Sequence, residues 1–179
     1  LPLGVEAFGE WMDLEFEELI QTGKMIKDFQ ECLPNGINLL QASLVDPAEK
    51  SLSQMLLGAI WTFTLFSETS VGGIKIDWDN AVQKLIESNE LIWRDKDKKG
   101  RPRERNCKPE LRKLSFKECV SSALNLKQKN EADFKLEAFI DPMGRSIKPA
   151  QVQHWFAAEL DQPLTIKDVK RQELLLLQC

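Results

Sequence analysis

Basic side chains gather in one segment of this 179-residue chain, and their chemistry stands out from the rest. Between Arg94 and Lys113 the sequence places ten lysines and arginines against four acids, a local balance of +6 in a chain whose formal net charge is −4. Lysine and arginine neutralise phosphates and release counterions, so this segment has the chemistry of a phosphate-backbone contact. The overall acidity argues against general nucleic-acid binding by the rest of the chain.

Turn residues interrupt this basic segment at 98–102, between two polar arms, which predicts a hairpin over residues 91–108 with an exposed tip. The aromatic ring at the base of the hairpin could stack on a nucleic-acid base or anchor the hairpin. Two other interpretations stay open, a solvated loop of alternating charge and a contact for an acidic protein partner. The candidate RNA-binding residues are Trp93, Arg94, Lys96, Lys98, Lys99, Arg101, Arg103 and Arg105.

Other reactive residue types are sparse. The single histidine, His154, falls on the polar side of a predicted helix, and the four cysteines lack the spacing of a zinc, thiol-redox or iron–sulfur motif. Cys107 lies in the basic segment and could have a lowered pKa. Asp13, Glu15 and Glu17 share one side of a predicted strand, as metal ligands or ordinary solvated residues would. The sequence therefore predicts no catalytic residue and no metal site.

The elements that would position these residues are short and alternate along the chain. Period-two patterns predict strands and patterns of period 3.6 predict helices. The predicted strands are 10–17, 37–45, 61–66, 91–93, 113–118, 134–140 and 164–177, the last interrupted near 168–171, and the predicted helices are 25–33, 51–57, one capped at Asp77 or Asp79, and one beginning at Pro149. This order predicts an α+β fold with mixed sheets and ferredoxin-like βαβ-type lobes, in two small subdomains spanning 1–72 and 73–179.

The composition is that of a soluble folded domain, with 42% hydrophobic and 29% charged residues. No apolar stretch approaches the roughly 20 residues that span a bilayer, so no membrane association is expected. Few, unclustered cysteines suit a reducing compartment, and we expect the cytoplasm. The chain opens without methionine or a signal peptide, which predicts that it was cut from a longer protein.

Segments spread along the chain carry a family resemblance. In order they are Leu1-Pro2-Leu3-Gly4-Val5-Glu6, Gly9-Glu10-Trp11-Met12-Asp13-Leu14, Leu33-Pro34-Asn35-Gly36, Ile86 with Asn89-Glu90-Leu91, Ile147-Lys148-Pro149-Ala150-Gln151-Val152, and Arg171 with Leu174-Leu175. Together they resemble DUF2344, the radical SAM-linked domain of unknown function, where SAM is S-adenosylmethionine. The opening hexapeptide is the most specific of these segments.

The resemblance implies a C-terminal companion domain, fused to or encoded beside a radical SAM protein that has a cobalamin-binding-type region. The iron–sulfur cluster, SAM and cobalamin are then expected in that partner, and no cofactor is expected in this chain. It also implies that a βα segment precedes the first motif and is missing here from the first lobe.

The function that follows is a non-catalytic accessory domain that presents RNA or another anionic substrate through the basic hairpin. Two alternatives of other classes stay open. One is a pure protein-docking or structural module that binds no nucleic acid. The other is an enzyme with a pocket that collects Asp13, Glu15 or Cys107.

Overall fold

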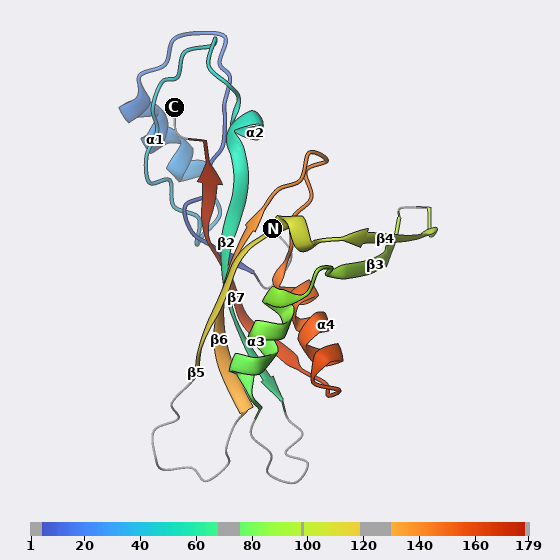
Figure 1. Cartoon of the computed structure of the whole chain (residues 1–179). Coiled ribbons are helices and arrows are strands. Elements are labelled where there is room, and N and C mark those ends of the chain that lie inside the picture. Colours follow the sequence, from blue (N-terminus) through green and yellow to red (C-terminus); the bar gives the residue numbers. More distant parts are fainter. Residues whose placement is uncertain (1–4, 68–75, 98, 119–129, 178–179) are drawn as a thin grey trace, which may run out of the picture. The chain divides into compact units, whose positions relative to one another are not determined.

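The computed structural model describes residues 5–67, 76–97, 99–118 and 130–177 (Figure 1). The elements in chain order are β1 (Glu6–Ala7), α1 (Thr22–Cys32), α2 (Leu52–Met55), β2 (Leu56–Ser67), α3 (Trp78–Glu87), β3 (Ile92–Lys96), β4 (Pro102–Asn106), the 3-10 helix η2 (Lys108–Glu110), β5 (Leu111–Glu118), β6 (Asn130–Phe139), α4 (Pro149–Glu159) and β7 (Thr165–Leu176). This content confirms the predicted α+β class. Within the described ranges, no helix has the length and apolar character needed to cross a membrane.

The chain forms two compact units, one made of Leu1–Glu10 with Leu56–Cys179 and the other of Trp11–Met55. Two small subdomains were predicted from the sequence. The boundary expected between residues 72 and 73 falls inside 68–75, which lie outside the described residues.

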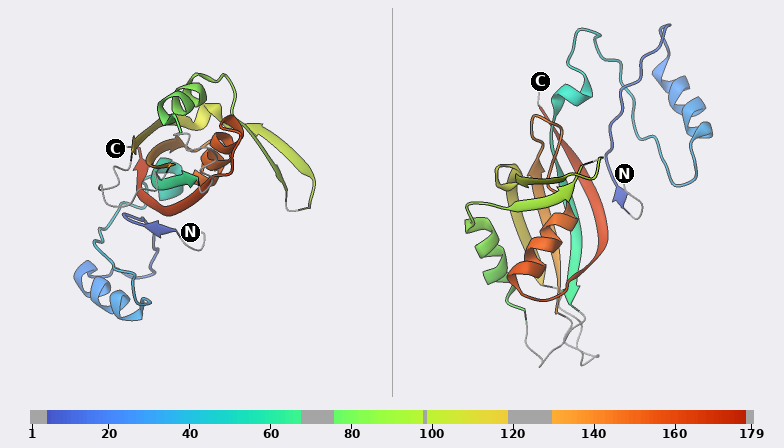
Figure 2. Two further views of the ribbon diagram at one scale, coloured as in Figure 1. Left: turned by 90° about the horizontal axis from the view of Figure 1, so that it is seen from below. Right: turned by 90° about the vertical axis from the view of Figure 1, so that its right-hand side faces the viewer.

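The first unit is built on a five-stranded mixed sheet of order β1-β7-β2-β6-β5, in which only β1 pairs in parallel. Its elements β2, α3, β5, β6, α4 and β7 follow the βαββαβ order of a ferredoxin-like unit. Figure 2 shows α3 and α4 together on one face of this sheet. The hairpin of β3 and β4 is an insertion between α3 and β5, and it forms a separate two-stranded sheet.

The core lies between the sheet and the two helices. Side chains alternate along the central strands, so Phe63 and Leu65 of β2 and Phe134 and Leu136 of β6 point toward the helices and are fully buried. The helices contribute buried apolar side chains at helical spacing: Trp78, Ala81, Val82 and Leu85 from α3, and Val152 and Phe156 from α4. Ile86, which was expected on the same face of α3, is 41% exposed. The predicted cap is confirmed, because the Asp77 carboxylate accepts a hydrogen bond from the Asn80 backbone amide at 3.0 Å.

Strand β7 is irregular at the place where the sequence predicts an interruption. Its register against β2 shifts on either side of the Lys170 and Arg171 pairs, and Asp168 has a left-handed backbone with φ of 52°. The shifts bring Lys170 opposite Thr62, on the sheet face that α3 and α4 leave open.

The Trp11–Met55 unit departs from the sequence predictions. The predicted helix is confirmed as α1, but the strands predicted at 10–17 and 37–45 are wrong, because both segments are irregular. A period-two pattern makes a strand only when a neighbouring strand pairs with it, and neither segment has such a neighbour among the described residues. Met12, Leu14 and Phe16, the apolar residues of the segment 10–17, are all exposed.

A glycine in β2 is required by close backbone packing. A Cβ atom at Gly58 would lie 2.2 Å from the Ala138 carbonyl oxygen of β6, which is backbone and cannot rotate away. We therefore expect Gly58→Ala to lower the free energy of unfolding by about 2 kcal/mol, measured by urea denaturation. Gly23→Ala is the matched control, because nothing outside its own stretch of helix lies within 4 Å of a Cβ built there, and it should not destabilise the protein. Equal losses in both variants would contradict this explanation.

Candidate functional site

The predicted basic hairpin exists as β3 and β4, which pair from Ile92 opposite Asn106 to Lys96 opposite Pro102. Figure 1 shows it projecting away from the five-stranded sheet. Its base is held against α4 by two aromatic contacts. The Trp155 indole N–H donates to the Ile92 carbonyl oxygen at 2.8 Å, and the Trp93 ring meets the His154 ring edge-on at 5.4 Å between centroids.

This geometry favours the anchoring role among the two that the sequence left open for Trp93. The ring is half-buried against His154, and its indole N–H donates to an Asp95 carboxylate oxygen at 3.3 Å. Trp93 is thus placed as an anchor of the hairpin. His154 is exposed, as the sequence predicted, and contributes a packing contact.

Arg105 has a different position from the other candidate cations. One terminal guanidinium nitrogen contacts both Glu110 carboxylate oxygens at 2.7 Å, and the other donates to the Ser146 carbonyl oxygen at 3.3 Å. The Arg105 and Glu110 side chains are only 14% and 8% exposed. Burial raises the pKa of Glu110, and Arg105 opposes that rise. Arg105 therefore joins the hairpin to the body of the domain.

The outer arginines of the hairpin form ion pairs that face solvent. Arg94 pairs with Glu104 at 2.5 Å, Arg101 with Asp97 at 2.7 Å, and Arg103 with Asp95 through two hydrogen bonds. The hydrogen bond from Arg103 lowers the pKa of Asp95, and bonds from Arg101 lower the pKa of Asp97. These three guanidinium groups remain at least half exposed, so they are accessible to a ligand.

The tip of the hairpin is a tight turn closed by Asp97. Its carboxylate accepts hydrogen bonds from the backbone amides of Lys99 and Arg101, and Gly100 has a positive φ of 78°. Among the described residues, the Lys96 and Lys99 ammonium groups have no hydrogen-bond or ion-pair partner. Lys98, also predicted as a binding residue, lies outside the described residues.

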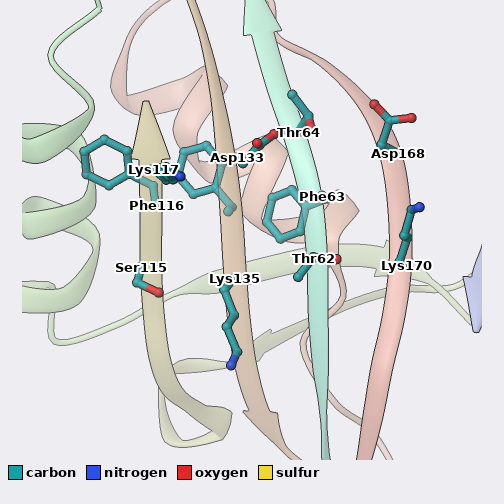
Figure 3. Close-up of a pocket in the computed structure, with 11 residues that line it drawn as sticks. Thr62, Phe63, Thr64, Ser115, Phe116, Lys117, Asp133, Lys135, Asp168 and Lys170 are labelled. Carbon is teal, nitrogen blue, oxygen red and sulfur yellow. Dashed lines mark hydrogen bonds between the residues drawn. The ribbon is translucent and has the colours of Figure 1, made fainter. Parts of the chain in front are cut away.

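A second charged surface was not predicted from the sequence. It is a cavity of about 510 Å³ on the open face of the sheet, which we call the sheet groove (Figure 3). The polar side chains that line it come from four strands: Ser115 and Lys117 from β5, Asp133 and Lys135 from β6, Thr62 and Thr64 from β2, and Asp168 and Lys170 from β7. The groove is assembled entirely by strand register.

The environment of Cys107 contradicts the hypothesis that this cysteine is reactive. The thiol is fully buried, and its sulfur accepts a hydrogen bond from the Gln151 side-chain amide at 3.7 Å. Burial raises the pKa of the thiol to about 11. It is therefore a protonated thiol at neutral pH. The Asp13, Glu15 and Glu17 pattern lies in an irregular segment, and no group of side chains suited to a metal ion occurs within the described ranges.

These observations define a ferredoxin-like α+β domain with an inserted, anchored basic hairpin. Residues 1–136 match the family described as "Uncharacterized protein conserved in bacteria (DUF2344)", and the chain belongs to this family. No curated protein and no solved structure matches the chain.

Proposed function

We propose that this chain is a non-catalytic accessory domain that binds RNA through its basic hairpin. One observation carries the proposal: three arginine head groups and two lysines are exposed on a ribbon whose base is fixed to the domain body. The hairpin from Ile92 to Asn106 holds seven basic and three acidic side chains, a balance of +4. An anchored cationic ribbon presents its charges to a phosphate backbone without first having to become ordered.

The carboxylates on the hairpin do not block this role. Exposed ion pairs contribute little to stability because water screens them. A phosphate can therefore replace a carboxylate on Arg94, Arg101 or Arg103 at little cost, and a guanidinium group can bind phosphate with two parallel hydrogen bonds. The carboxylates lower the net positive charge of the ribbon. A ligand that carries several phosphates is therefore favoured, because its phosphates can replace several carboxylates at once.

The partner that we propose is a radical SAM protein, on the strength of the resemblance described above. In this assignment the iron–sulfur cluster, SAM and cobalamin belong to the partner, and this chain brings an anionic substrate to it in the cytoplasm.

The direct test is titration of the purified chain with a single-stranded RNA of 12 nucleotides at several salt concentrations. We expect the triple variant Lys96→Gln, Lys99→Gln, Arg101→Gln to bind at least tenfold more weakly, with the log–log salt slope reduced by about 2. The matched control is Lys24→Gln, Lys27→Gln, Lys50→Gln, which removes the same charge from exposed positions of the other unit. Equal losses in the two triple variants would reject the hairpin as the binding surface.

A protein-docking module is the second candidate, and the Trp11–Met55 unit favours it. Large apolar side chains are exposed there, with Leu19 at 91% and Leu40 at 82%, and α1 has no buried residue. Exposed apolar area of this kind is typical of surfaces that bind another protein. The same titration separates the candidates, because a docking module would not bind the RNA even at low salt.

A further inference from the structure

We propose that the sheet groove binds a small phosphorylated ligand, with its phosphate at one end of the groove and a group rich in hydrogen-bond donors at the other. This inference goes beyond RNA binding by the hairpin and does not depend on it. The groove lies on the open face of the sheet, whereas the base of the hairpin packs against α4, which covers the opposite face (Figures 2 and 3).

The phosphate end is a row of cross-strand neighbours, which we call the donor row. Register places Ser115 opposite Lys135, Lys135 opposite Thr62, and Thr62 opposite Lys170, in the order seen across Figure 3. Adjacent strands lie about 4.8 Å apart, so two ammonium groups can reach one phosphate above Thr62. Register extends the row to Glu6 of β1, opposite Lys170, and Glu6 is its one carboxylate among the described residues.

The hydrogen bond made by Thr62 supports this assignment. Its hydroxyl oxygen accepts from the Gln172 side-chain amide at 2.9 Å, so the hydroxyl hydrogen is left to be donated to a ligand. Lys170 pairs with the exposed carboxylate of Glu6 at 2.9 Å, and that contact can be given up to a phosphate because it faces solvent. Lys135 is exposed and has no ion-pair partner among the described residues.

The next row adds carboxylate acceptors to the groove, beside Lys117 on β5 and Lys167, which lies opposite Thr64 on β7. The Thr64 hydroxyl donates to one Asp133 oxygen at 2.6 Å, so the other carboxylate oxygen is left to accept from a ligand. Asp168 lines the same end of the groove, while Lys117 stands opposite Asp133 on the edge strand. Two residues along a strand separate the rows by about 7 Å. A ligand that fits both rows has a phosphate at one end and hydroxyl or amino groups at the other, as a nucleoside monophosphate does.

The groove suits a small molecule better than a nucleic-acid strand. The groove is open to solvent along one side, and its volume of about 510 Å³ has room for a ligand the size of a nucleotide. Sheets that bind single-stranded RNA stack the bases on exposed aromatic rings. Three phenylalanines line the groove, and their rings belong to the core on the helix side: Phe63 and Phe134 are at most 2% exposed, and half-buried Phe116 stacks on Phe134 at 5.9 Å between centroids. They therefore offer no such platform.

The test uses the full chain with three probes: adenosine 5′-monophosphate, inorganic phosphate and adenosine. We expect the monophosphate to bind, phosphate to bind more weakly and adenosine not to bind, with amide chemical-shift changes centred on residues 62–64 and 133–135. Lys135→Gln should weaken monophosphate binding about tenfold. Lys113→Gln is the matched control, since it removes the same charge from the same sheet face outside the groove and should leave binding unchanged.

Each contrary outcome has a definite meaning. Absence of shifts with both the monophosphate and phosphate, or equal losses in Lys135→Gln and Lys113→Gln, would overturn the proposal. Displacement of the monophosphate by the RNA oligonucleotide from the same amides would replace the small ligand with an RNA backbone. The hairpin triple variant should still bind the monophosphate, so failure of the RNA proposal and failure of this one are distinguishable.

Discussion

Phe134→Ala is expected to lower the free energy of unfolding by about 4 kcal/mol. The Phe134 ring is 1% exposed and lies at the centre of an aromatic cluster that joins the sheet to both helices. Its centroid is 5.5 Å from Phe63, 5.3 Å from Trp78 and 5.2 Å from Phe156. Truncation removes buried apolar area and leaves a cavity. The neighbouring rings are fixed on three different elements, so they cannot all move in to fill it.

Chemical denaturation measures this loss, with far-UV circular dichroism to show that the variant still folds. Phe139→Ala is the matched control from the same strand, because its ring is 37% exposed and contacts Arg112 at the surface, so we expect a loss below about 1 kcal/mol. A similar loss for both phenylalanines would mean that the cluster around Phe134 is not the centre of the core.

Local patterns predicted the elements of the ferredoxin-like unit. Alternation predicted the strand at 134–140, where Phe134, Leu136 and Ala138 are buried and Ile140 is half-buried, and Pro149 marked the first turn of α4. The same rule failed at 10–17, where the alternation is equally regular. The alternation of apolar and polar residues shows that a segment favours a strand. Whether the strand forms depends on a neighbouring strand that can pair with it.

The hairpin and the sheet groove also differ in how well the sequence predicts them. The hairpin could be found from the sequence because its cations and its turn are contiguous, although the pairing of Arg105 with Glu110 was not foreseen. The sheet groove could not be found, because its donor row draws on Thr62, Ser115, Lys135 and Lys170, which only the strand order and the bulges of β7 bring together. Register is a property of the whole sheet, and no short motif encodes it.

Arg105→Met is expected to lower the free energy of unfolding by about 3 kcal/mol at neutral pH. Methionine keeps much of the packing but leaves the Glu110 carboxylate, whose side chain is 8% exposed, without its charge partner. A buried carboxylate without a partner is costly, whereas the pair itself adds little net stability, so the single variant should suffer more than the double variant Arg105→Met/Glu110→Gln.

The pH dependence of this loss identifies its cause. Burial already raises the pKa of Glu110 above its ordinary value of 4.5, and removal of Arg105 should raise it further. Between the unfolded and folded pKa the folded state binds more protons, so the variant's stability relative to the unchanged chain falls as pH rises through the folded pKa and recovers at lower pH. Urea denaturation of both proteins at pH 5 and pH 7.5 measures this difference. A loss that is the same at both pH values, or is not relieved in the double variant, would show that Arg105 acts through packing alone.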